Sequence, residues 1–181
     1  MNTHYFIGIK VPKPISREII DARGKTNLHQ THKTLPVVDD LHITLFYLGH
    51  VEKNLIDQMS RSFEKSDWDS FDLSTNELSH FGNDLTPRVV YVSLEESEKI
   101  KQLQKKIVEV ISNYLDVNQS KEFNAHITIA KKWASNCPMS TEKFSLPKQS
   151  FEVNHFSVFQ INPNRTPRYE EISSISTRKV N

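Results

Sequence analysis

The sequence predicts an α+β fold made of two pseudo-symmetric halves that meet at a central cleft. Two runs rich in β-branched and aromatic residues, HYFIGIKV at 4–11 and PRVVYVSLE at 87–95, are typical of strands. Each run is followed by apolar residues at helical spacing, a polar connection, and a strand-like run containing His-Ile-Thr, at 42–44 and at 126–128. This shared order of elements indicates an internal duplication.

The first half begins with the strand at 4–11, which ends at Pro12 because proline cannot donate a backbone hydrogen bond. Isoleucines near helical spacing predict that a helix follows, starting at Pro14 or Ser16 and fading in the polar stretch NLHQTHKT. These isoleucines are Ile15, Ile19 and Ile20.

The clearest helix is predicted over 96–115, where apolar residues recur every three or four positions and form one face. They are Ile100, Leu103, Ile107, Val110, Ile111 and Leu115. Between the halves, WDSFDLSTNELSHFG at 68–82 predicts one or two strands. Near the end of the chain, 151–162 and 168–179 predict two more strands, separated by the turn-like PNRTP.

The two halves also agree in their spacing. Phe6 precedes His42 by 36 positions, and Tyr91 precedes His126 by 35. Two such halves related by a pseudo-twofold axis would bring both histidines, which are 84 residues apart in the chain, to one central cleft.

The length of 181 residues is typical of one domain, and we expect residues 1–181 to form a single domain. With 23 basic and 22 acidic residues the net charge is +1, so any nucleic-acid contact must be local. The amino-terminal apolar stretch is too short for a membrane span, and the lone Cys137 excludes an internal disulfide. We therefore expect a soluble, cytoplasmic, monomeric protein that does not bind a membrane.

The pattern His-x-Thr occurs four times, so its presence alone carries little information. The copies at 29–31 and 32–34 follow one another in a polar connector, and we interpret them as surface residues without a chemical role. The copies at 42–44 and 126–128 differ because each lies in a β-prone run. Residues two apart on a strand share one face, so the His and Thr of each copy should face the cleft while their aliphatic neighbours anchor the strand.

Two imidazoles and two hydroxyls suit phosphodiester transfer without a metal. The unperturbed pKa of histidine is ~6.5, so a neutral imidazole can take a proton from water while a protonated one gives a proton to the departing oxygen. Threonine hydroxyls can hydrogen-bond the phosphoryl oxygens. The candidate catalytic residues are therefore His42, His126, Thr44 and Thr128, and the residues alone do not distinguish the acid from the base.

Two other chemistries fit less well. Neither motif has a second histidine or a nearby cysteine at a zinc-binding spacing, and threonine is a poor ligand, so we expect no metal and no cofactor. Asp39 and Asp40 precede His42, but they fit a cap or a solvated turn better. Cys137 lies in the polar loop SNCPMS, which shows no sign of an activated thiol.

The blocks LHITLFYLG and FNAHITIAK together resemble the two-histidine phosphoesterases, specifically the RNA 2′,3′-cyclic phosphodiesterases of the 2′-5′ RNA ligase-like family. The resemblance extends over nearly the whole chain, from YFIGIKVP to the final TPRYEEI. It implies a bilobed α+β fold with antiparallel sheets lining the central cleft and helices outside. It also implies a hydrolase that opens the terminal 2′,3′-cyclic phosphate of RNA to a 2′-phosphomonoester, with 2′-5′ RNA joining as the reverse reaction.

The resemblance assigns a role to each residue of the two motifs. By position, His42 is the proton donor and His126 is the proton acceptor that activates water. Thr44 and Thr128 hold the phosphate. The acid and base labels depend on the resemblance.

Three positions depart from the pattern of the relatives. Ala125 stands where proline is frequent, and Lys131 stands where arginine is frequent. Lys131 keeps a positive charge for the phosphate but loses the two-pronged geometry of a guanidinium. Tyr47 stands where phenylalanine is usual, and we interpret this as a change in the core with little effect.

A near-neutral protein needs local cations to hold an anion, and aromatic rings can stack on an unpaired base. The candidate cations are Arg88, Lys131, Lys132 and Arg168, and the candidate rings are Trp133, Tyr169 and Phe46. Core packing is the favoured interpretation of Phe46. The residues retained as substrate-binding candidates are Lys131, Arg88, Trp133 and Tyr169.

Three functions remain open. The favoured one is the RNA-end cyclic phosphodiesterase, whose partners are RNA ends or nucleotides that carry a 2′,3′-cyclic phosphate. The second is a related enzyme that acts on small cyclic phosphates, such as ADP-ribose cyclic phosphate, or on 2′-5′ oligonucleotides. The third is an RNA-binding module without turnover, which the intact His and Thr of both motifs disfavour.

Overall fold

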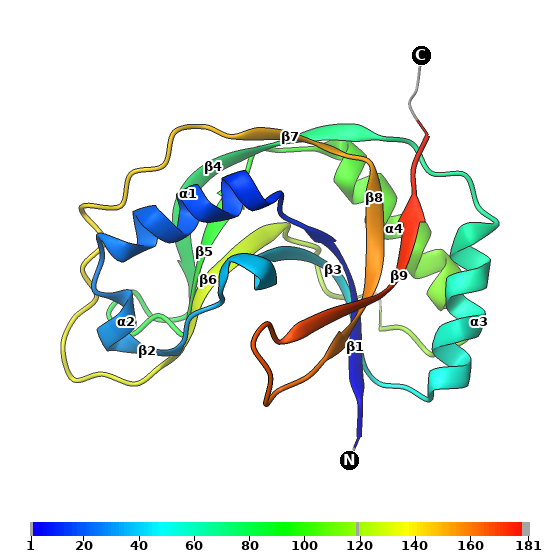
Figure 1. Ribbon diagram of the computed structural model, residues 1–181, viewed down its shortest axis with the longest axis horizontal. Coiled ribbons are helices and arrows are strands. Elements are labelled where there is room, and N and C mark those ends of the chain that lie inside the picture. Colours follow the sequence, from blue (N-terminus) through cyan, green and yellow to red (C-terminus); the bar gives the residue numbers. More distant parts are fainter. Residues whose placement is uncertain (1, 119, 179–181) are drawn as a thin grey trace.

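The computed structural model describes residues 2–118 and 120–178. This part of the chain forms nine strands, four α-helices and one short 3-10 helix (Figure 1). None of the helices in the described residues is long and apolar enough to cross a membrane. In chain order the elements are β1 (His4–Lys10), α1 (Lys13–Gly24), α2 (Leu28–Thr31), β2 (His32–Thr34), η1 (Val38–Asp40), β3 (His42–His50), α3 (Lys53–Glu64), β4 (Phe71–Phe81), β5 (Val89–Leu94), α4 (Glu98–Ile111), β6 (His126–Trp133), β7 (Ser150–Val153), β8 (His155–Ile161) and β9 (Tyr169–Ser176).

The strands form one antiparallel sheet in the order β7-β4-β5-β6-β3-β1-β8-β9, and β2 pairs with the far end of β6. The predicted α+β class with antiparallel strands is confirmed. The sheets of the two halves are continuous with each other, because β3 of the first half pairs with β6 of the second.

The junction between the halves is the pair Ile43 on β3 and Ile127 on β6. These are the middle residues of the two His-Ile-Thr motifs. Because the two strands run antiparallel through this pair, residue 42 lies toward residue 128 and residue 44 toward residue 126. An approximate twofold axis at this pair therefore exchanges the two motifs.

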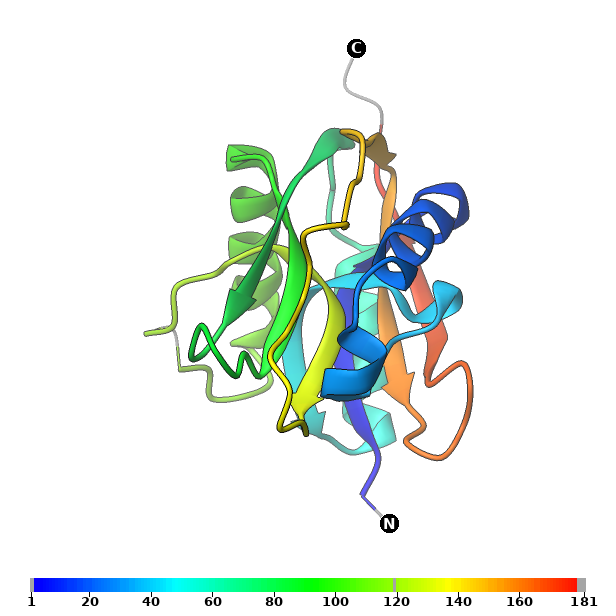
Figure 2. The same cartoon turned by 90° about the vertical axis from the view of Figure 1, so that its left-hand side faces the viewer.

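The main helix of each half packs against a strand of the other half. α1 follows β1 of the first half and contacts β6 of the second half as well as η1 of its own half, whereas α4 follows β5 of the second half and contacts β3 and α3 of the first. Figure 2 shows α1 (blue) and α4 (green) on opposite sides of the sheet. This exchange covers both faces of the junction and fixes the two halves against each other.

The predicted helices in the two halves are confirmed as α1 and α4, and 68–82 contains one strand, β4. The run at 151–162, predicted as one strand, forms two strands, β7 and β8. α3 was not predicted, although its buried face keeps helical spacing: Ile56, Met59 and Phe63. The short elements α2 and β2 were also not predicted, because their sequence is polar.

The polar connector before η1 is partly buried. Thr31 and His32 are both buried, so the interpretation of the first two His-x-Thr copies as surface residues is wrong for these side chains. The Thr31 hydroxyl lies 2.9 Å from His32 Nδ1, and His32 Nε2 lies 2.7 Å from the carbonyl oxygen of Pro87. A neutral imidazole that accepts one hydrogen bond and donates the other is satisfied without charge, which permits its burial.

Gly8 of β1 lets that strand approach β3 at the motif. Gly8 pairs with Thr44, and a Cβ at Gly8 would lie 2.7 Å from the carbonyl oxygen of Ile43. A side chain does not fit at that distance. Glycine at this position therefore helps to set the strand that carries His42 and Thr44.

Candidate active site

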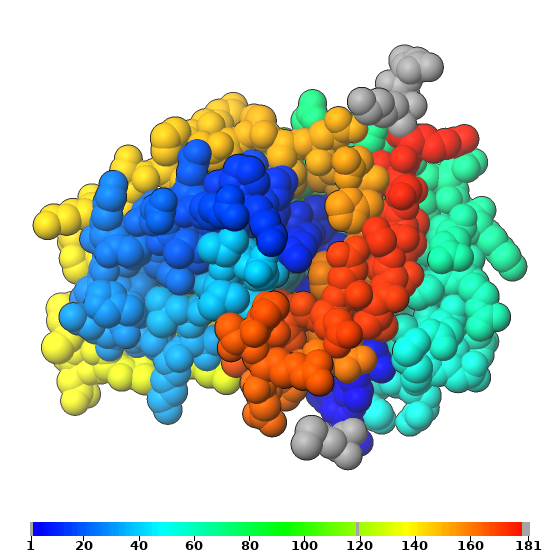
Figure 3. Space-filling view, in the orientation of Figure 1, coloured from blue at the N-terminus to red at the C-terminus, as the bar shows by residue number. Residues whose placement is uncertain are grey.

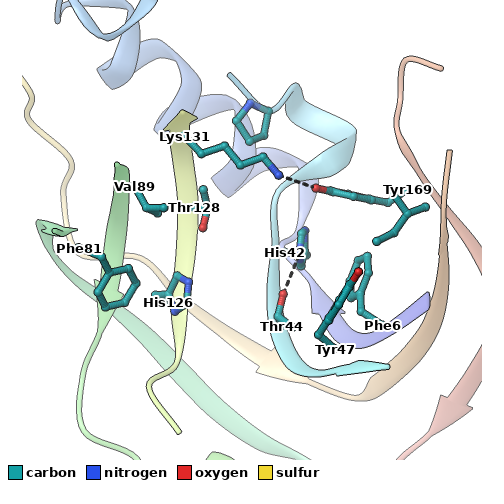
Figure 4. Close-up of a pocket in the computed structure, with 12 residues that line it drawn as sticks. Phe6, His42, Thr44, Tyr47, Phe81, Val89, His126, Thr128, Lys131 and Tyr169 are labelled. Atoms are coloured by element: carbon teal, nitrogen blue, oxygen red, sulfur yellow. Dashed lines mark hydrogen bonds between the residues drawn. The ribbon is translucent and has the colours of Figure 1, made fainter. Parts of the chain in front are cut away.

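The two motifs lie at the starts of β3 and β6 and face one pocket. His42, Thr44, His126 and Thr128 all line this pocket, which has a volume of about 300 Å³ (Figure 4). Their aliphatic neighbours face away and are buried: Ile43, Leu45, Ile127 and Ile129. The alternation expected from the strand period is thus observed in both motifs.

Both histidines are anchored through Nδ1 in the same way. His42 Nδ1 lies 2.8 Å from the carbonyl oxygen of Asp40, and His126 Nδ1 lies 2.8 Å from that of Asn124. A carbonyl oxygen only accepts, so each Nδ1 carries a hydrogen and donates it. In the neutral imidazole, Nε2 then holds the lone pair. Each Nε2 can therefore accept a proton, and it can donate that proton once the ring is charged.

Aromatic packing fixes the plane of each imidazole. The ring of Phe6 lies 4.5 Å from that of His42, and the ring of Tyr91 lies 5.0 Å from that of His126, measured between centroids. These are the two pairs whose spacing in the sequence matches, so the matched offsets report a real contact in each half. A second ring meets each imidazole edge-on: Tyr169 at 4.8 Å from His42 and Phe81 at 5.0 Å from His126.

The two histidines differ in the groups around Nε2. The Thr44 hydroxyl lies 2.9 Å from His42 Nε2 and donates to it when the imidazole is neutral. His126 Nε2 has no hydrogen-bond partner among residues 2–118 and 120–178. The symmetric backbone therefore carries two chemically different imidazoles.

Burial lowers the pKa of both histidines, because the pocket solvates an imidazolium poorly. For His42, burial lowers the pKa to about 4, and the positive charge of Lys131 acts in the same direction against the hydrogen bond to Asp40. Burial also lowers the pKa of His126 from its ordinary value, again against the hydrogen bond to a backbone carbonyl. At pH 7 the protein by itself holds both imidazoles neutral.

Lys131 reaches the same pocket from β6, three residues after Thr128. Its Nζ donates to the hydroxyl of Tyr169 at 3.2 Å and lies 6.0 Å from the centre of that ring (Figure 4). The next residue, Lys132, has a φ of 66°, which is rare for a residue other than glycine, and its side chain is exposed. Lys131 is thus the one of these adjacent lysines that lines the pocket.

Asp40 links η1 to the hairpin between β8 and β9. Its buried carboxylate accepts the backbone N–H of Arg168 at 2.9 and 3.0 Å and that of Tyr169 at 3.1 Å, while its carbonyl oxygen holds His42. The expectation that Asp40 caps or solvates a turn is therefore wrong. An acidic residue two positions before the motif was the available signal, but its partners lie about 130 residues away and no local pattern identifies them.

Not every substrate-binding candidate reaches the pocket. Lys131 and Tyr169 line it, whereas Arg88 and Trp133 do not. Trp133 packs edge-on against His32 with 5.3 Å between ring centroids, and Arg88 is exposed. These positions give Arg88 and Trp133 no contact with the pocket.

Tyr47 does not lie in the core, contrary to the expectation from the sequence. It is 55% exposed, lines the pocket, and hydrogen-bonds through its hydroxyl to His4 Nδ1. The register of β1 and β3 shifts between Ile7 and Gly8, which interrupts the strict alternation of β3. Phe46, by contrast, packs against the core as expected.

No group of three or more His, Cys, Asp or Glu side chains in the described part of the chain is arranged to hold a metal ion. Cys137 is exposed in its loop. The groups that line the pocket are instead imidazoles, hydroxyls, one ammonium group and aromatic rings. Such groups can hold an anion and move protons.

Two strands that each present a histidine and a threonine to one pocket define the class of paired-histidine site expected from the sequence. The chain belongs to the 2′-5′ RNA ligase superfamily, whose family model matches residues 11–165. It is 27% identical over 172 residues to a Bacillus subtilis protein named RNA 2′,3′-cyclic phosphodiesterase, with 93% of both chains covered. It is 28% identical to a Geobacillus stearothermophilus protein of the same name, over 95% of this chain and 56% of that protein.

Solved structures share the fold. A crystal structure of E. coli LigT with 3′-AMP matches with a TM-score of 0.80 and 19% identity, over 98% of this chain and 99% of that one. TT0787 of Thermus thermophilus matches with a TM-score of 0.75 and 19% identity, over 98% and 100% of the two chains. At this level of identity the likeness establishes a common fold.

Proposed function

We propose that this protein hydrolyses the 2′,3′-cyclic phosphate at the 3′ end of RNA to a 2′-phosphomonoester, without a metal ion. The observation that carries the proposal is the pair of imidazoles held through Nδ1 over one pocket, each beside a threonine on the same strand. The names of the Bacillus and Geobacillus relatives support the substrate class.

In the proposed reaction, His126 Nε2 takes a proton from water, and the water oxygen attacks phosphorus. The bond from phosphorus to the ribose 3′ oxygen breaks, and His42 Nε2 gives a proton to that oxygen. The phosphate remains on the 2′ oxygen. Thr44, Thr128 and Lys131 line the same pocket and would hydrogen-bond the phosphoryl oxygens as negative charge develops on them.

The role of His42 as donor requires its imidazole to be charged when substrate is present. The depressed pKa of His42 disfavours that state in the protein alone. A phosphate anion in the pocket attracts the imidazolium and offsets the positive charge of Lys131. Bound phosphate therefore raises the pKa of His42. The profile of kcat against pH reports the substrate complex, and that of kcat/KM reports the free protein. The pKa of His42 should therefore be higher in the kcat profile than in the kcat/KM profile.

The same groups would also support 2′-5′ joining. A ribose 5′-hydroxyl in the place of water would lose its proton to His126 and attack the cyclic phosphate, again with departure of the 3′ oxygen. Hydrolysis is favoured over joining because water is the solvent and is present in large excess over any ribose 5′-hydroxyl. Joining is therefore proposed as a secondary reaction of the same site.

A single assay tests the proposal. The protein, with EDTA present, is incubated with RNA that ends in a 2′,3′-cyclic phosphate and with a nucleoside 2′,3′-cyclic phosphate, beside His42→Ala and His126→Ala. We expect turnover of the RNA, and loss of turnover but not of RNA binding in both variants. Unchanged turnover in both variants would refute catalysis by the histidines, and RNA binding without turnover by the native protein would support a silent binding module.

A further inference from the structure

A second pocket adjoins the active site on the other side of the Lys131–Tyr169 hydrogen bond. It has a volume of about 80 Å³ and shares Pro36, Lys131 and Tyr169 with the active-site pocket. Its other walls come from the connector that leads from β2 into η1 and from the hairpin between β8 and β9. Figure 3 shows these segments next to each other on the surface, the connector in light blue and the hairpin in orange.

Positive charge dominates this second pocket. Lys131, Arg165 and Arg168 line it, together with one carboxylate, that of Asp40. The Arg168 side chain has no ion pair or hydrogen bond within residues 2–118 and 120–178, and Arg165 has only a 3.9 Å contact with Glu170. Both guanidinium groups are therefore available to an incoming anion.

The carboxylate of Asp40 forms no ion pair with these cations within the described residues. Its two oxygens already accept the backbone N–H groups of Arg168 and Tyr169, which holds the hairpin in place. The connector is held as well, because Arg23 Nη1 donates to the carbonyl oxygens of Pro36 at 2.6 Å and Ile129 at 3.1 Å. Both walls of the second pocket are thus fixed by hydrogen bonds.

Hydroxyl groups also line the second pocket, beside the apolar side chains of Leu35, Pro36 and Val37. Thr34 and Thr166 both border the second pocket. Thr34 pairs directly with Lys131 across β2 and β6, so the two side chains lie on the same face of the sheet. Two guanidinium groups, an ammonium group and hydroxyls form a set of donors that suits phosphate oxygens.

We propose that the second pocket binds the phosphodiester on the 5′ side of the nucleotide that carries the 2′,3′-cyclic phosphate. This inference rests on the proposed function and defines its substrate as an RNA strand end rather than a free nucleoside cyclic phosphate. In such an end, one ribose separates the cyclic phosphate from the next phosphodiester. The two pockets adjoin, since Pro36, Lys131 and Tyr169 line both of them, and this arrangement suits neighbouring phosphates of one strand.

The test compares four substrates that differ in this second phosphate. They are adenosine 2′,3′-cyclic phosphate, its 5′-phosphorylated form, the dinucleotide ApA with a terminal 2′,3′-cyclic phosphate, and the same dinucleotide with a neutral methylphosphonate linkage. We expect kcat/KM of the native protein to be about 10-fold or more higher for the charged dinucleotide than for the nucleoside, because charge-assisted contacts have about that effect. The methylphosphonate dinucleotide should lose most of this gain, since it keeps the second base and removes the charge.

The variants Arg165→Gln, Arg168→Gln and their combination locate the effect. The double variant should lower kcat/KM for the charged dinucleotide about 10-fold more than for the nucleoside. Arg17→Gln, which removes an exposed cation on α1 away from both pockets, is the matched control and should change neither value. Thermal unfolding of each variant establishes that it is folded.

The outcomes separate this inference from the proposed function. Turnover of all four substrates without preference for the charged dinucleotide, or equal losses for dinucleotide and nucleoside in the double variant, would overturn the second phosphate site and leave the phosphodiesterase intact. A gain with the 5′-phosphorylated nucleoside but not with the dinucleotide would overturn the assignment to an RNA strand. Calorimetry with the open products, adenosine 2′-phosphate and ApA 2′-phosphate, tests the second pocket even if no substrate is turned over. Tighter binding of the dinucleotide product, lost in the double variant, would support the second phosphate site. Equal binding of the two products would refute it.

Discussion

The strand start at His42 and the strand start at His126 share a backbone and differ in their surroundings. Each histidine donates from Nδ1 to the carbonyl oxygen two residues earlier, and each packs against an aromatic ring from the neighbouring strand. The Thr44 hydroxyl meets Nε2 of His42, whereas the Nε2 of His126 has no such partner in the described residues. The approximate twofold axis thus places both imidazoles without making them equivalent.

Equivalent positions outside the motifs also differ between the two halves. Three residues after the threonine stands Tyr47 in the first half and Lys131 in the second, and both line the pocket. Two residues before the histidine stands Asp40 in the first half, with a buried carboxylate, and Asn124 in the second, which is exposed. The symmetry of the backbone therefore positions the two reactive nitrogens. The differing side chains at equivalent positions of the two halves can give the two histidines separate roles.

The largest effect is expected from exchanging the histidines themselves. His42→Asn and His126→Asn should each lower kcat about 10³-fold for a natural cyclic phosphate, the magnitude usual for a general acid or base. A substrate whose 3′ bridging oxygen is replaced by sulfur distinguishes the two, because a thiolate leaves without a proton. Activity of His42→Asn should be largely restored with this substrate while that of His126→Asn is not. Restoration of His126→Asn instead would reverse the two roles.

A smaller effect should come from the residues two positions before each histidine. Asp40→Ala leaves the N–H groups of Arg168 and Tyr169 without acceptors, which should lower the free energy of unfolding by about 2 to 3 kcal/mol and kcat/KM about 10-fold. Asn124→Ala is the matched control and should change stability by less than about 0.5 kcal/mol, because that side chain is exposed. Urea denaturation and initial rates measure both variants. Equal effects in the two would show that the carboxylate of Asp40 holds nothing in place.

The motifs themselves could be predicted from the sequence because strand alternation and matched spacing are local properties. The offsets from Phe6 to His42 and from Tyr91 to His126 correspond to ring contacts in the structure. The helix α4 was likewise visible as a regular apolar face. The closing of both halves around one pocket followed from their repetition.

The residues that break the symmetry could not be predicted in this way. Asp40 meets its partners across a gap of about 130 positions, and the exposure of Tyr47 depends on a register shift between β1 and β3. His32 is buried because Thr31 and a distant carbonyl satisfy its two nitrogens. Each of these depends on tertiary contacts, which composition and periodicity do not encode.

The pH profile offers a finer test of the asymmetry. Because burial lowers the pKa of both histidines, the singly protonated active form should be most abundant below pH 6.5, and kcat/KM should have its optimum there. The pKa of His42 is lowered more than that of His126, so it sets the acidic limb of the profile even though His42 is the donor. Lys131→Met removes a charge that lowers the pKa of His42, so this acidic limb should move to higher pH by up to about one unit. Lys53→Met, which removes an exposed cation of α3, should leave the limb in place. An optimum above pH 7, or a limb that Lys131→Met does not move, would contradict this description of the site.

The smallest effect is expected in the stability of the protein toward acid. The pKa of His42 is about 4 in the folded protein and ~6.5 in the unfolded chain, so between these values the unfolded chain binds a proton that the folded protein does not. Above pH 6.5 His42 makes no pH-dependent contribution to the free energy of unfolding. As the pH falls toward 4, protonation of His42 in the unfolded chain lowers that free energy by an amount on the order of 1 to 2 kcal/mol. The amount is limited because the ring is partly exposed. His42→Gln removes this contribution and should narrow the loss of stability between pH 7 and pH 4.5, measured by urea denaturation at each pH. His126→Gln should act in the same direction and less strongly, because the charge of Lys131 lowers the pKa of His42 alone. Identical losses in the native protein and His42→Gln would mean that His42 titrates as an ordinary exposed histidine and that the two halves are not electrostatically distinct.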